Sequence, residues 1–288
     1  MTQKRANMDE QKEQNLSPDA VKQWWESAIT DIAPGAIRVR GYAIEELIGR
    51  ISFPAMIWLV LRGELPTHRQ AELFGAVLVA GVDHGPQAPS IAIARMAMTC
   101  GIGLNGAIAS GVNVLGDVHG GAGQQCMELL ADIASRESKA TTPDAALRAG
   151  LEEFHAKHGR FIPGFGHRFH GIDPRAARLS ELIREAARDG IISGRYLAIG
   201  EGVQRALALG KAKPPPMNVD GITAVMLLEF GFPPELARGV FVLSRSVGIC
   251  AHAYEQAQKG ERIKGPIPPQ FGFRYTGAPP RKLPDELP

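Results

Sequence analysis

Three histidines that each lie next to a glycine are the side chains of this chain best placed to do chemistry. They are His84, His119 and His167. A glycine lets the backbone turn sharply and lets a ligand approach closely, so a histidine beside one can point into a cleft. The aspartate of the segment 218–221, Asp220, could supply a base. Together these four side chains predict an acid–base site.

Two arginines could bind the carboxylates of a substrate. Arg245 lies in a strongly apolar segment, 241–250, so we expect it to be buried. A buried guanidinium needs an anionic partner, because an unpaired charge in a dry site is costly, and its planar fork matches a carboxylate. Arg175 follows His167 by only eight residues and begins a predicted helix, which keeps the two close.

Arg245 also belongs to a stripe on the last predicted helix. Arg238, Arg245 and His252 follow one another at intervals of seven residues, so they share one face of that helix. A stripe of this kind is ordinarily a solvated helix face, but the apolar neighbours of Arg245 argue against full exposure at its centre.

Other interpretations of these residues stay open at this point. The histidine pairs His155 with His158 and His167 with His170 have a spacing that metal sites use. Since no cysteine or glutamate lies at ligand spacing to complete such a site, we predict no metal site. Asp220 precedes an apolar helix and could serve only as its N-cap.

The segment 101–106 fits the glycine pattern GxGxxG of dinucleotide-binding loops. A site of that kind requires a strand before the loop and an acidic residue about 20 positions after it. Here the preceding segment is helical in pattern and no βαβ pattern surrounds it. We therefore expect loop glycines between two packed helices.

The composition indicates an ordinary globular protein. Of 288 residues, 44% are hydrophobic and 22% charged, and the net charge is +2. No dense stripe of lysine and arginine is present, so nucleic acid is not an expected partner, and no apolar run reaches the ~20 residues that cross a membrane. The three isolated cysteines are expected to be buried, reduced thiols in the cytoplasm. Residues 1–16 are polar, lack the apolar core of a signal peptide, and predict a disordered lead.

The elements that must position these residues are predicted to be almost all helices, which makes the fold class all-α. Prolines and capping residues mark the helix starts, and glycines mark the ends. The one convincing strand is the alternating segment 36–40. One predicted helix begins at Ser17. The others span residues 44–62, 67–82, 89–99, 120–135, 142–158, 173–189, 196–209, 220–230 and 234–259. Residues 211–216 predict a hinge, and we expect an extended tail from Pro266.

In their order along the chain, these segments resemble the citrate synthase superfamily over about residues 41–277. The similar segments are GYAIEEL at 41–47, LRGELPT at 61–67, VHGGA at 118–122, PGFGHRFHGIDPR at 163–175, NVD at 218–220 and SRSVG at 244–248. The resemblance implies an all-α, citrate synthase-like fold and a homodimer. It also implies a large domain of residues 17–119 plus 217–288 and a small domain of residues 120–216, with the site between them.

The resemblance gives each site residue a role in chemistry on acetyl-CoA and oxaloacetate. His119 would donate a hydrogen bond to the thioester oxygen, and Asp220 would remove the methyl proton. His167 would bind and protonate the ketone oxygen. The carboxylate-binding side chains would be His84, Arg175 and Arg245. Lys264 or Arg262 would take the place of an arginine that family members bring from the neighbouring subunit. The CoA-binding residues would be Gly164, Phe165, Gly166 and Arg168. Coenzyme A would be a substrate, and no permanently bound cofactor is implied.

Two glycines distinguish the chain from ordinary citrate synthases, which typically carry a glutamate at the position of Gly85 and an aromatic residue at that of Gly221. In both respects the chain resembles the citryl-CoA lyase module of ATP-citrate lyase. We therefore expect an enzyme that forms or cleaves the carbon–carbon bond between acetyl-CoA and oxaloacetate, as a citrate synthase or a citryl-CoA lyase. The alternatives are the same chemistry on another acyl-CoA or 2-oxo acid, such as 2-methylcitrate synthesis, a metal-dependent hydrolase, and a non-catalytic binding paralogue.

Overall fold

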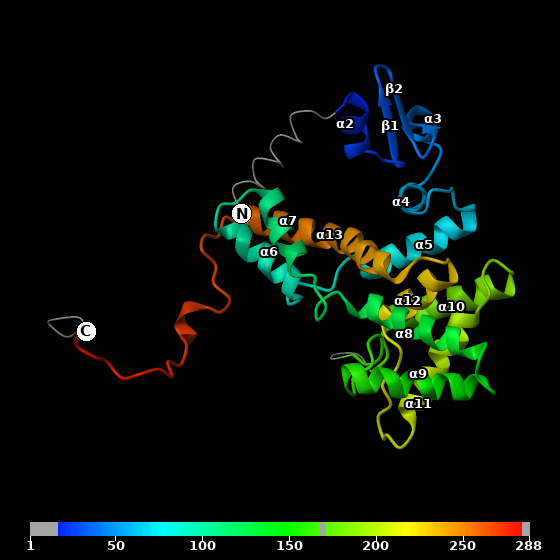
Figure 1. Cartoon of the computed structure of the whole chain (residues 1–288). Helices are drawn as coiled ribbons and strands as arrows, with labels where there is room; N and C mark the ends of the chain where they lie inside the picture. Colours follow the sequence, from blue (N-terminus) through cyan, green and yellow to red (C-terminus); the bar gives the residue numbers. More distant parts are fainter. Residues whose placement is uncertain (1–16, 168–170, 284–288) are drawn as a thin grey trace, which may run out of the picture. The chain divides into compact units, whose positions relative to one another are not determined.

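The computed structural model describes residues 17–167 and 171–283, and this part of the chain is largely helical (Figure 1). The predicted all-α fold class is therefore confirmed, with one small sheet in addition. The predicted disordered lead at residues 1–16 lies outside the described residues. Among the helices described, none is both long and apolar enough to cross a membrane.

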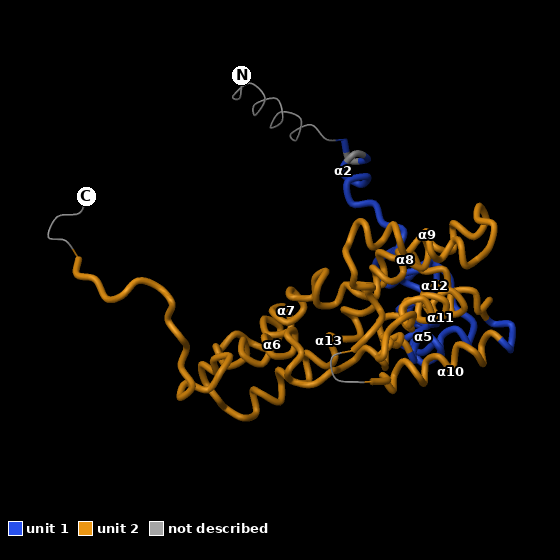
Figure 2. Tube along the Cα trace, turned by 90° about the horizontal axis from the view of Figure 1, so that it is seen from below, with its two compact units in different colours: residues 1–76, 188–191 blue, residues 77–187, 192–288 orange. Residues whose placement is uncertain are grey.

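The chain divides into two compact units (Figure 2). Unit 1 comprises residues 1–76 and 188–191, and unit 2 comprises residues 77–187 and 192–288. Helix α5 (His68–Gly81) passes from the sequence of unit 1 into that of unit 2. The large and small domains that the family resemblance implies, with a boundary near residue 120, stay a prediction.

Unit 1 contains helix α2 (Pro18–Trp24) and an antiparallel sheet of β1 (Thr30–Ala33), β2 (Ala36–Val39) and β3 (Tyr42–Ala43). The predicted strand is the central one. Two-residue turns join the strands, with a φ of 75° at Gly35 in the first turn and of 50° and 87° at Arg40 and Gly41 in the second. Such left-handed residues suit tight turns between paired strands. The two-residue β3 is too short for an alternating pattern, and β1 is exposed along its whole length, so it has no buried face to produce one.

The predicted helix over residues 44–62 is wrong, because the structure has two helices there, α3 (Ile44–Leu47) and α4 (Phe53–Arg62). Gly49 adopts a φ of 77° between them, outside the right-handed helical region. Ser52 then caps α4, its hydroxyl oxygen accepting the N–H of Ala55 at 3.3 Å. Ser52 is thus the sequence signal for the start of a second helix. The apolar residues on both sides of it made the segment resemble one continuous helix.

Unit 2 is built mainly from helices that agree with the predicted ones to within a few residues at each end. They are α6 (Pro89–Thr99), α7 (Leu104–Asn113), α8 (Ala122–Glu137), α9 (Pro143–His158), α10 (Pro174–Arg188), α11 (Arg195–Ala208), α12 (Val219–Glu229) and α13 (Pro234–Gln258). Helix α7 is the exception, since no helix was predicted there. It packs so closely on α6 that a Cβ at Gly111 would lie 2.7 Å from the Ser90 carbonyl oxygen. The segment 101–106 is therefore not all loop as expected, because its residues 104–106 begin α7. The helices that flank the loop, α6 and α7, do pack against each other.

Helix α13 connects the two ends of unit 2, since it contacts α6 and α7 and also α8 and α12 (Figure 1). Its Ile249 is fully buried, as are Ile222 and Met226 of α12, so these helices form much of the core. The core of unit 1 is a smaller cluster around Leu59. Between α13 and residue 283, where the described part of the tail ends, the chain is extended as expected except for a single 3₁₀ turn, η1 (Pro269–Phe271).

Candidate active site

Unit 2 contains a cavity of about 210 Å³ that collects the side chains singled out by the sequence. Its walls come from α5, α8, α10, α12 and α13 and from the loops that carry the three histidines. The predicted residues that line it are His84, His119, His167, Arg175, Asp220 and Arg245. Residues far apart in the chain therefore meet at one place, as an acid–base site requires.

The rings of His84 and His167 meet edge to face, with centroids 5.4 Å apart and an angle of 85° between their planes. His84 lies in the loop between α5 and α6, and His167 follows a loop that is tied to the start of α12. In that loop Gly166 donates its N–H to the Pro216 carbonyl oxygen at 2.7 Å. The side-chain amide of Asn218 donates to the Gly166 carbonyl oxygen at 2.7 Å. Two imidazoles this close can contact the same small ligand.

Helix α6 orients His119. The Nε2 atom of His119 lies 3.2 Å from the backbone nitrogen of Ser90 and 3.1 Å from its hydroxyl oxygen. Ser90 is in the first turn of α6, where backbone N–H groups have no partner within the helix. Because a backbone N–H can only donate, Nε2 accepts, and we assign the proton of the neutral ring to Nδ1. His119 is thus a donor through Nδ1, which suits a developing oxyanion. Nothing in the sequence had indicated Ser90.

Asp220 lies in the first turn of α12 but does not cap it. The cap is Asn218, whose side-chain oxygen accepts the N–H groups of Asp220 at 2.9 Å and of Gly221 at 3.2 Å. The interpretation of Asp220 as an N-cap is therefore wrong. Burial raises the pKa of Asp220, although the charges of Arg175 and Arg245 oppose this rise. A raised pKa makes a carboxylate a stronger base.

Arg175 is held by Asp173, a carboxylate with only 1% of its area exposed. Nε and Nη2 of Arg175 donate to its two oxygens at 3.0 and 2.9 Å. The same carboxylate accepts the Val219 N–H at 3.2 Å and so links the first turns of α10 and α12. Burial raises the pKa of Asp173, but Arg175 and the hydrogen bonds lower it overall, so the pair keeps its charges. In the sequence, Asp173 signalled only a helix start.

Arg245 is buried, as predicted, with 4% of its area exposed. Its Nε donates to the Gly81 carbonyl oxygen at 3.0 Å, and its guanidinium carbon lies 4.8 Å from the centroid of the Phe241 ring. Burial lowers the pKa of Arg245, while the charges of Asp83 and Asp220 raise it. Arginine nevertheless stays protonated in proteins. The cavity wall therefore carries a poorly hydrated positive charge that favours an anionic ligand.

A second, more open cleft of unit 2 adjoins the cavity at His167. Phe165 and Gly166, two of the predicted CoA-binding residues, line this cleft. Its basic side chains are His155, Arg160, Lys211 and Lys213. Gly164 instead packs against the backbone of α12, where its Cβ position would lie 2.8 Å from the α-carbon of Gly221. Arg168 lies outside the described residues.

Lys264 does not line the cavity of its own chain. Its Nζ pairs with Glu261 at 2.7 Å, and its backbone N–H donates to the Thr99 hydroxyl at 2.9 Å. Its predicted place in the site of a neighbouring subunit stays a prediction.

The histidine pair of α9 has local partners. His155 Nδ1 forms a hydrogen bond with the Gly159 carbonyl oxygen at 2.9 Å, and the His158 ring packs on Phe154 with centroids 4.6 Å apart. Over residues 17–167 and 171–283, no three histidine, cysteine, aspartate or glutamate side chains come together as metal ligands. His170 lies outside these ranges.

Comparison with known proteins gives consistent matches. A family model for the C-terminal domain of citrate synthase matches residues 22–80 and 68–266. A citrate synthase of Haloferax volcanii is 32% identical over 76% of this chain and 53% of its own length. A citrate/2-methylcitrate synthase of Bacillus subtilis is 29% identical over 78% of this chain and 58% of its own. The chain thus spans about half the length of these relatives. The structure of a citryl-CoA lyase from Hydrogenobacter thermophilus superposes with a TM-score of 0.79 at 33% identity, over 90% of this chain and 97% of that one.

Proposed function

Since the chain belongs to the citrate synthase family, we propose that its cavity catalyses carbon–carbon bond chemistry between acetyl-CoA and oxaloacetate. The observation that carries this proposal is the meeting of a carboxylate with a raised pKa, three histidines and two arginines in one cavity. A thioester α-proton is too weakly acidic for a carboxylate alone, so the developing oxyanion must be stabilised by a placed donor. The cavity offers both groups.

In the direction of condensation, Asp220 accepts a proton from the methyl group while Nδ1–H of His119 donates a hydrogen bond to the thioester oxygen. The methyl carbon then bonds to the ketone carbon, and His167 gives a proton to the resulting alkoxide, which yields citryl-CoA. Cleavage follows the same steps in reverse. The raised pKa of Asp220 supports its role as the base.

Two arginines and a histidine of the cavity can bind the carboxylates of the keto acid. Arg245 and Arg175 each offer a guanidinium at the cavity wall, and His84 supplies a further donor next to His167. Guanidinium groups bind carboxylates with paired hydrogen bonds. We propose that these three residues hold the carboxylates of oxaloacetate.

The basic cleft beside His167 supports a place for coenzyme A. Phosphate groups favour clusters of positive side chains, and the cleft contains Arg160, Lys211 and Lys213. Phe165 and Gly166 line this cleft and directly precede His167, which lines both the cleft and the cavity. We propose that they bind the CoA thioester with Gly164 and Arg168.

Cleavage of citryl-CoA is the direction we favour. The match to a citryl-CoA lyase covers nearly all of that protein, and two departures from ordinary citrate synthases point the same way. Gly85 has a φ of 79°, which disfavours a side chain, and a side chain at Gly221 would overlap the Gly164 carbonyl oxygen. Neither the glutamate nor the aromatic residue of a typical synthase suits these positions.

The direct experiment incubates the protein with (3S)-citryl-CoA and, separately, with acetyl-CoA plus oxaloacetate. Acetyl-CoA and free CoA are followed over time. Release of acetyl-CoA and oxaloacetate without free CoA is the expected result for a lyase, whereas free CoA from the second mixture would identify a synthase. No conversion in either mixture would contradict the proposed function.

We also propose a cytoplasmic homodimer. The tail after α13 exposes large aromatic side chains, with Phe273 89% exposed and Phe271 and Tyr275 similarly uncovered. Such a tail could wrap a second copy of the chain and bring Lys264 near its cavity. Of the three cysteines, Cys126 is buried as predicted, whereas Cys100 is exposed and Cys250 is partly exposed. All three are free thiols, which supports a reducing compartment.

A further inference from the structure

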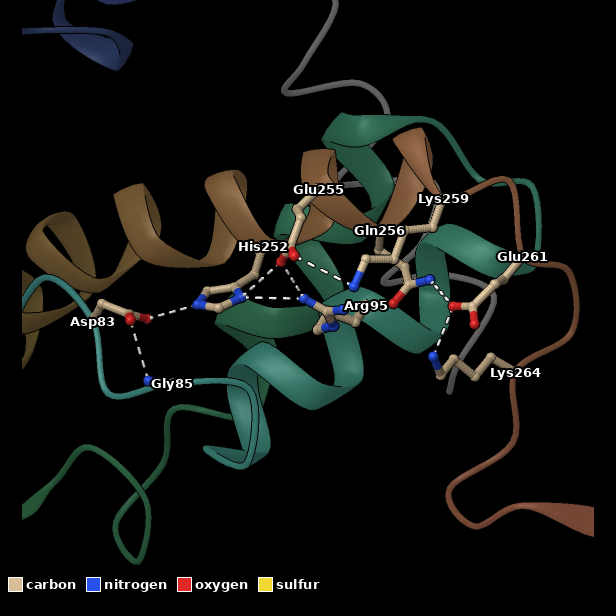
Figure 3. A network of polar contacts seen from close by, with 9 residues as sticks. All are labelled: Asp83, Gly85, Arg95, His252, Glu255, Gln256, Lys259, Glu261 and Lys264. Carbon is tan, nitrogen blue, oxygen red and sulfur yellow. Dashed lines mark hydrogen bonds and ion pairs between the residues drawn. The ribbon is translucent and has the colours of Figure 1, made fainter.

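His252 holds the aspartate that directly precedes a site histidine (Figure 3). Its Nε2 lies 3.2 Å from Oδ1 of Asp83, and the other oxygen of Asp83 accepts the Gly85 N–H at 3.2 Å. Burial raises the pKa of Asp83, but the hydrogen bonds from Gly85 and His252 lower it overall, so the carboxylate stays charged. These contacts hold the chain on both sides of His84.

Arg95 orients His252 in turn. Its Nη1 lies 3.2 Å from Nδ1 of His252 and 2.7 Å from an oxygen of Glu255 (Figure 3). Because a guanidinium can only donate, Nδ1 accepts, and the proton of the neutral ring is on Nε2, the nitrogen that faces Asp83. The His252 side chain is 18% exposed and that of Asp83 is 40% exposed, so the contact is shielded from water mainly on the side of the imidazole. The imidazole is therefore held from both sides.

Helix α13 also lies directly against the backbone of this loop. A side chain at Gly248 would overlap the Val82 carbonyl oxygen, and Arg245 donates to the Gly81 carbonyl oxygen. The loop of His84 is therefore attached to α13 at three successive turns of the helix.

Arg238 makes a related contact with the loop of His119. Its Nη2 donates to Oδ1 of Asp117 at 2.5 Å, and Asp117 lies two residues before His119. On the other side of that histidine, the Cβ position of Gly120 lies 3.3 Å from the Phe241 ring of α13. The ion pair is more exposed than the His252 contact, so we expect its effect to be smaller.

We propose that the α13 stripe is a positioning device for the cavity. Arg238 is a positioning residue for His119, and His252 is a positioning residue for His84. Arg245 lies between Arg238 and His252 on the helix, at the cavity wall. Members of the stripe are about 10 Å apart along the helix axis, so one rigid helix sets the separation of the two histidine loops. The inference rests on the proposed function, in which His84 binds the keto acid and His119 acts on the thioester. Substitutions of Arg238 and of His252 should therefore affect different steps of the reaction.

The test compares full-length variants in oxaloacetate affinity, measured by calorimetry, and in kcat for the acetyl-CoA reaction. His252→Leu should weaken oxaloacetate binding about 10-fold, since a misplaced binding group loses much of its interaction. His252→Gln keeps an N–H that can reach Asp83 and should retain most of the affinity. Arg238→Gln should leave oxaloacetate affinity unchanged and lower kcat about fivefold.

The controls separate this inference from the proposed function. Arg178→Gln removes an exposed ion pair of α10 with Glu181 and should change neither quantity. If His84→Ala leaves oxaloacetate affinity unchanged, the proposed role of His84 is wrong. If His84→Ala weakens it but a folded His252→Leu variant does not, the positioning inference is overturned while the proposed function stands.

Two further results keep the test decisive. Equal losses in His252→Leu and His252→Gln would overturn the inference, because the polar contact with Asp83 would then not matter. If His252→Leu fails to fold, Asp83→Asn takes its place. It removes the charged acceptor and should weaken oxaloacetate binding by a similar factor, and unchanged binding would overturn the inference.

Discussion

Asp220 carries the strongest prediction at the scale of single residues. Asp220→Asn keeps the shape of the side chain but removes the proposed base, so kcat should fall by ~10²–10⁴. Steady-state kinetics on citryl-CoA and on acetyl-CoA with oxaloacetate measure this loss. Circular dichroism confirms that the variant is folded, and near-normal turnover would remove Asp220 from the mechanism.

The raised pKa of Asp220 also predicts how stability depends on pH. The folded-state pKa lies above that of the unfolded chain, so the folded state binds more protons between the two values. The free energy of unfolding therefore falls as pH rises through that window. Asp220→Asn has no buried charge, so its melting temperature should equal or exceed that of the wild type at pH 7. The difference should shrink toward the ordinary pKa of aspartate, and a clearly less stable variant at pH 7 would contradict the prediction.

Arg245 gives a second test at this scale. Arg245→Lys keeps the positive charge but loses the planar fork and the Nε donor that reaches Gly81. We expect oxaloacetate affinity to fall about 10-fold, the loss of one charge-assisted hydrogen bond. Calorimetry measures it, and Arg178→Lys on the exposed face of α10 is the matched control. Equal affinities in the two variants would argue against a direct contact with the keto acid.

At the scale of elements, the contact between α12 and the loop of His167 depends on two glycines. A Cβ at Gly221 would overlap the Gly164 carbonyl oxygen, which also accepts the Asn218 N–H at 2.9 Å. Gly221→Ala should push the loop away, lower the free energy of unfolding by about 1–3 kcal/mol, and reduce turnover by moving His167.

Gly239→Ala on α13 is the control for this junction. Nothing lies within 4 Å of a Cβ at Gly239, and the residue is exposed within a helix. Alanine there should stabilise the protein by roughly 0.5–1 kcal/mol. Denaturant unfolding measures both variants, and an unchanged stability of Gly221→Ala would show that the junction can open without cost.

At the scale of the whole molecule, the proposed homodimer makes a simple prediction. Light scattering coupled to size exclusion should give about twice the 30.9 kDa of one chain, and deletion of the exposed tail after residue 265 should lower dimer stability. If the two predicted domains close on their ligands, solution scattering should also show compaction with oxaloacetate and CoA. A monomeric mass would contradict the dimer and remove the proposed role of Lys264.

Much of this molecule could be predicted from the sequence, because its signals act over a few residues. Prolines and glycines marked the helices around the site, and the apolar neighbours of Arg245 indicated its burial. The motifs around the histidines, Asp220 and the arginines indicated the family and the residues that line the cavity. Local signals failed where two of them competed, as at Gly49 and Ser52 within an apolar run, and where strands were very short.

Only the tertiary structure decided which partners these side chains have. The Ser90 N–H that sets the tautomer of His119 comes from 29 residues away, and the carboxylate of Asp173 bonds a backbone N–H 46 residues further on. Arg245 reaches a carbonyl group 164 residues earlier in the chain. The sequence by itself therefore determined which residues line the cavity and carry the proposed chemistry. The packing of α6, α12 and α13 determined their protonation, orientation and separation, because those properties depend on neighbours that only the folded chain brings together.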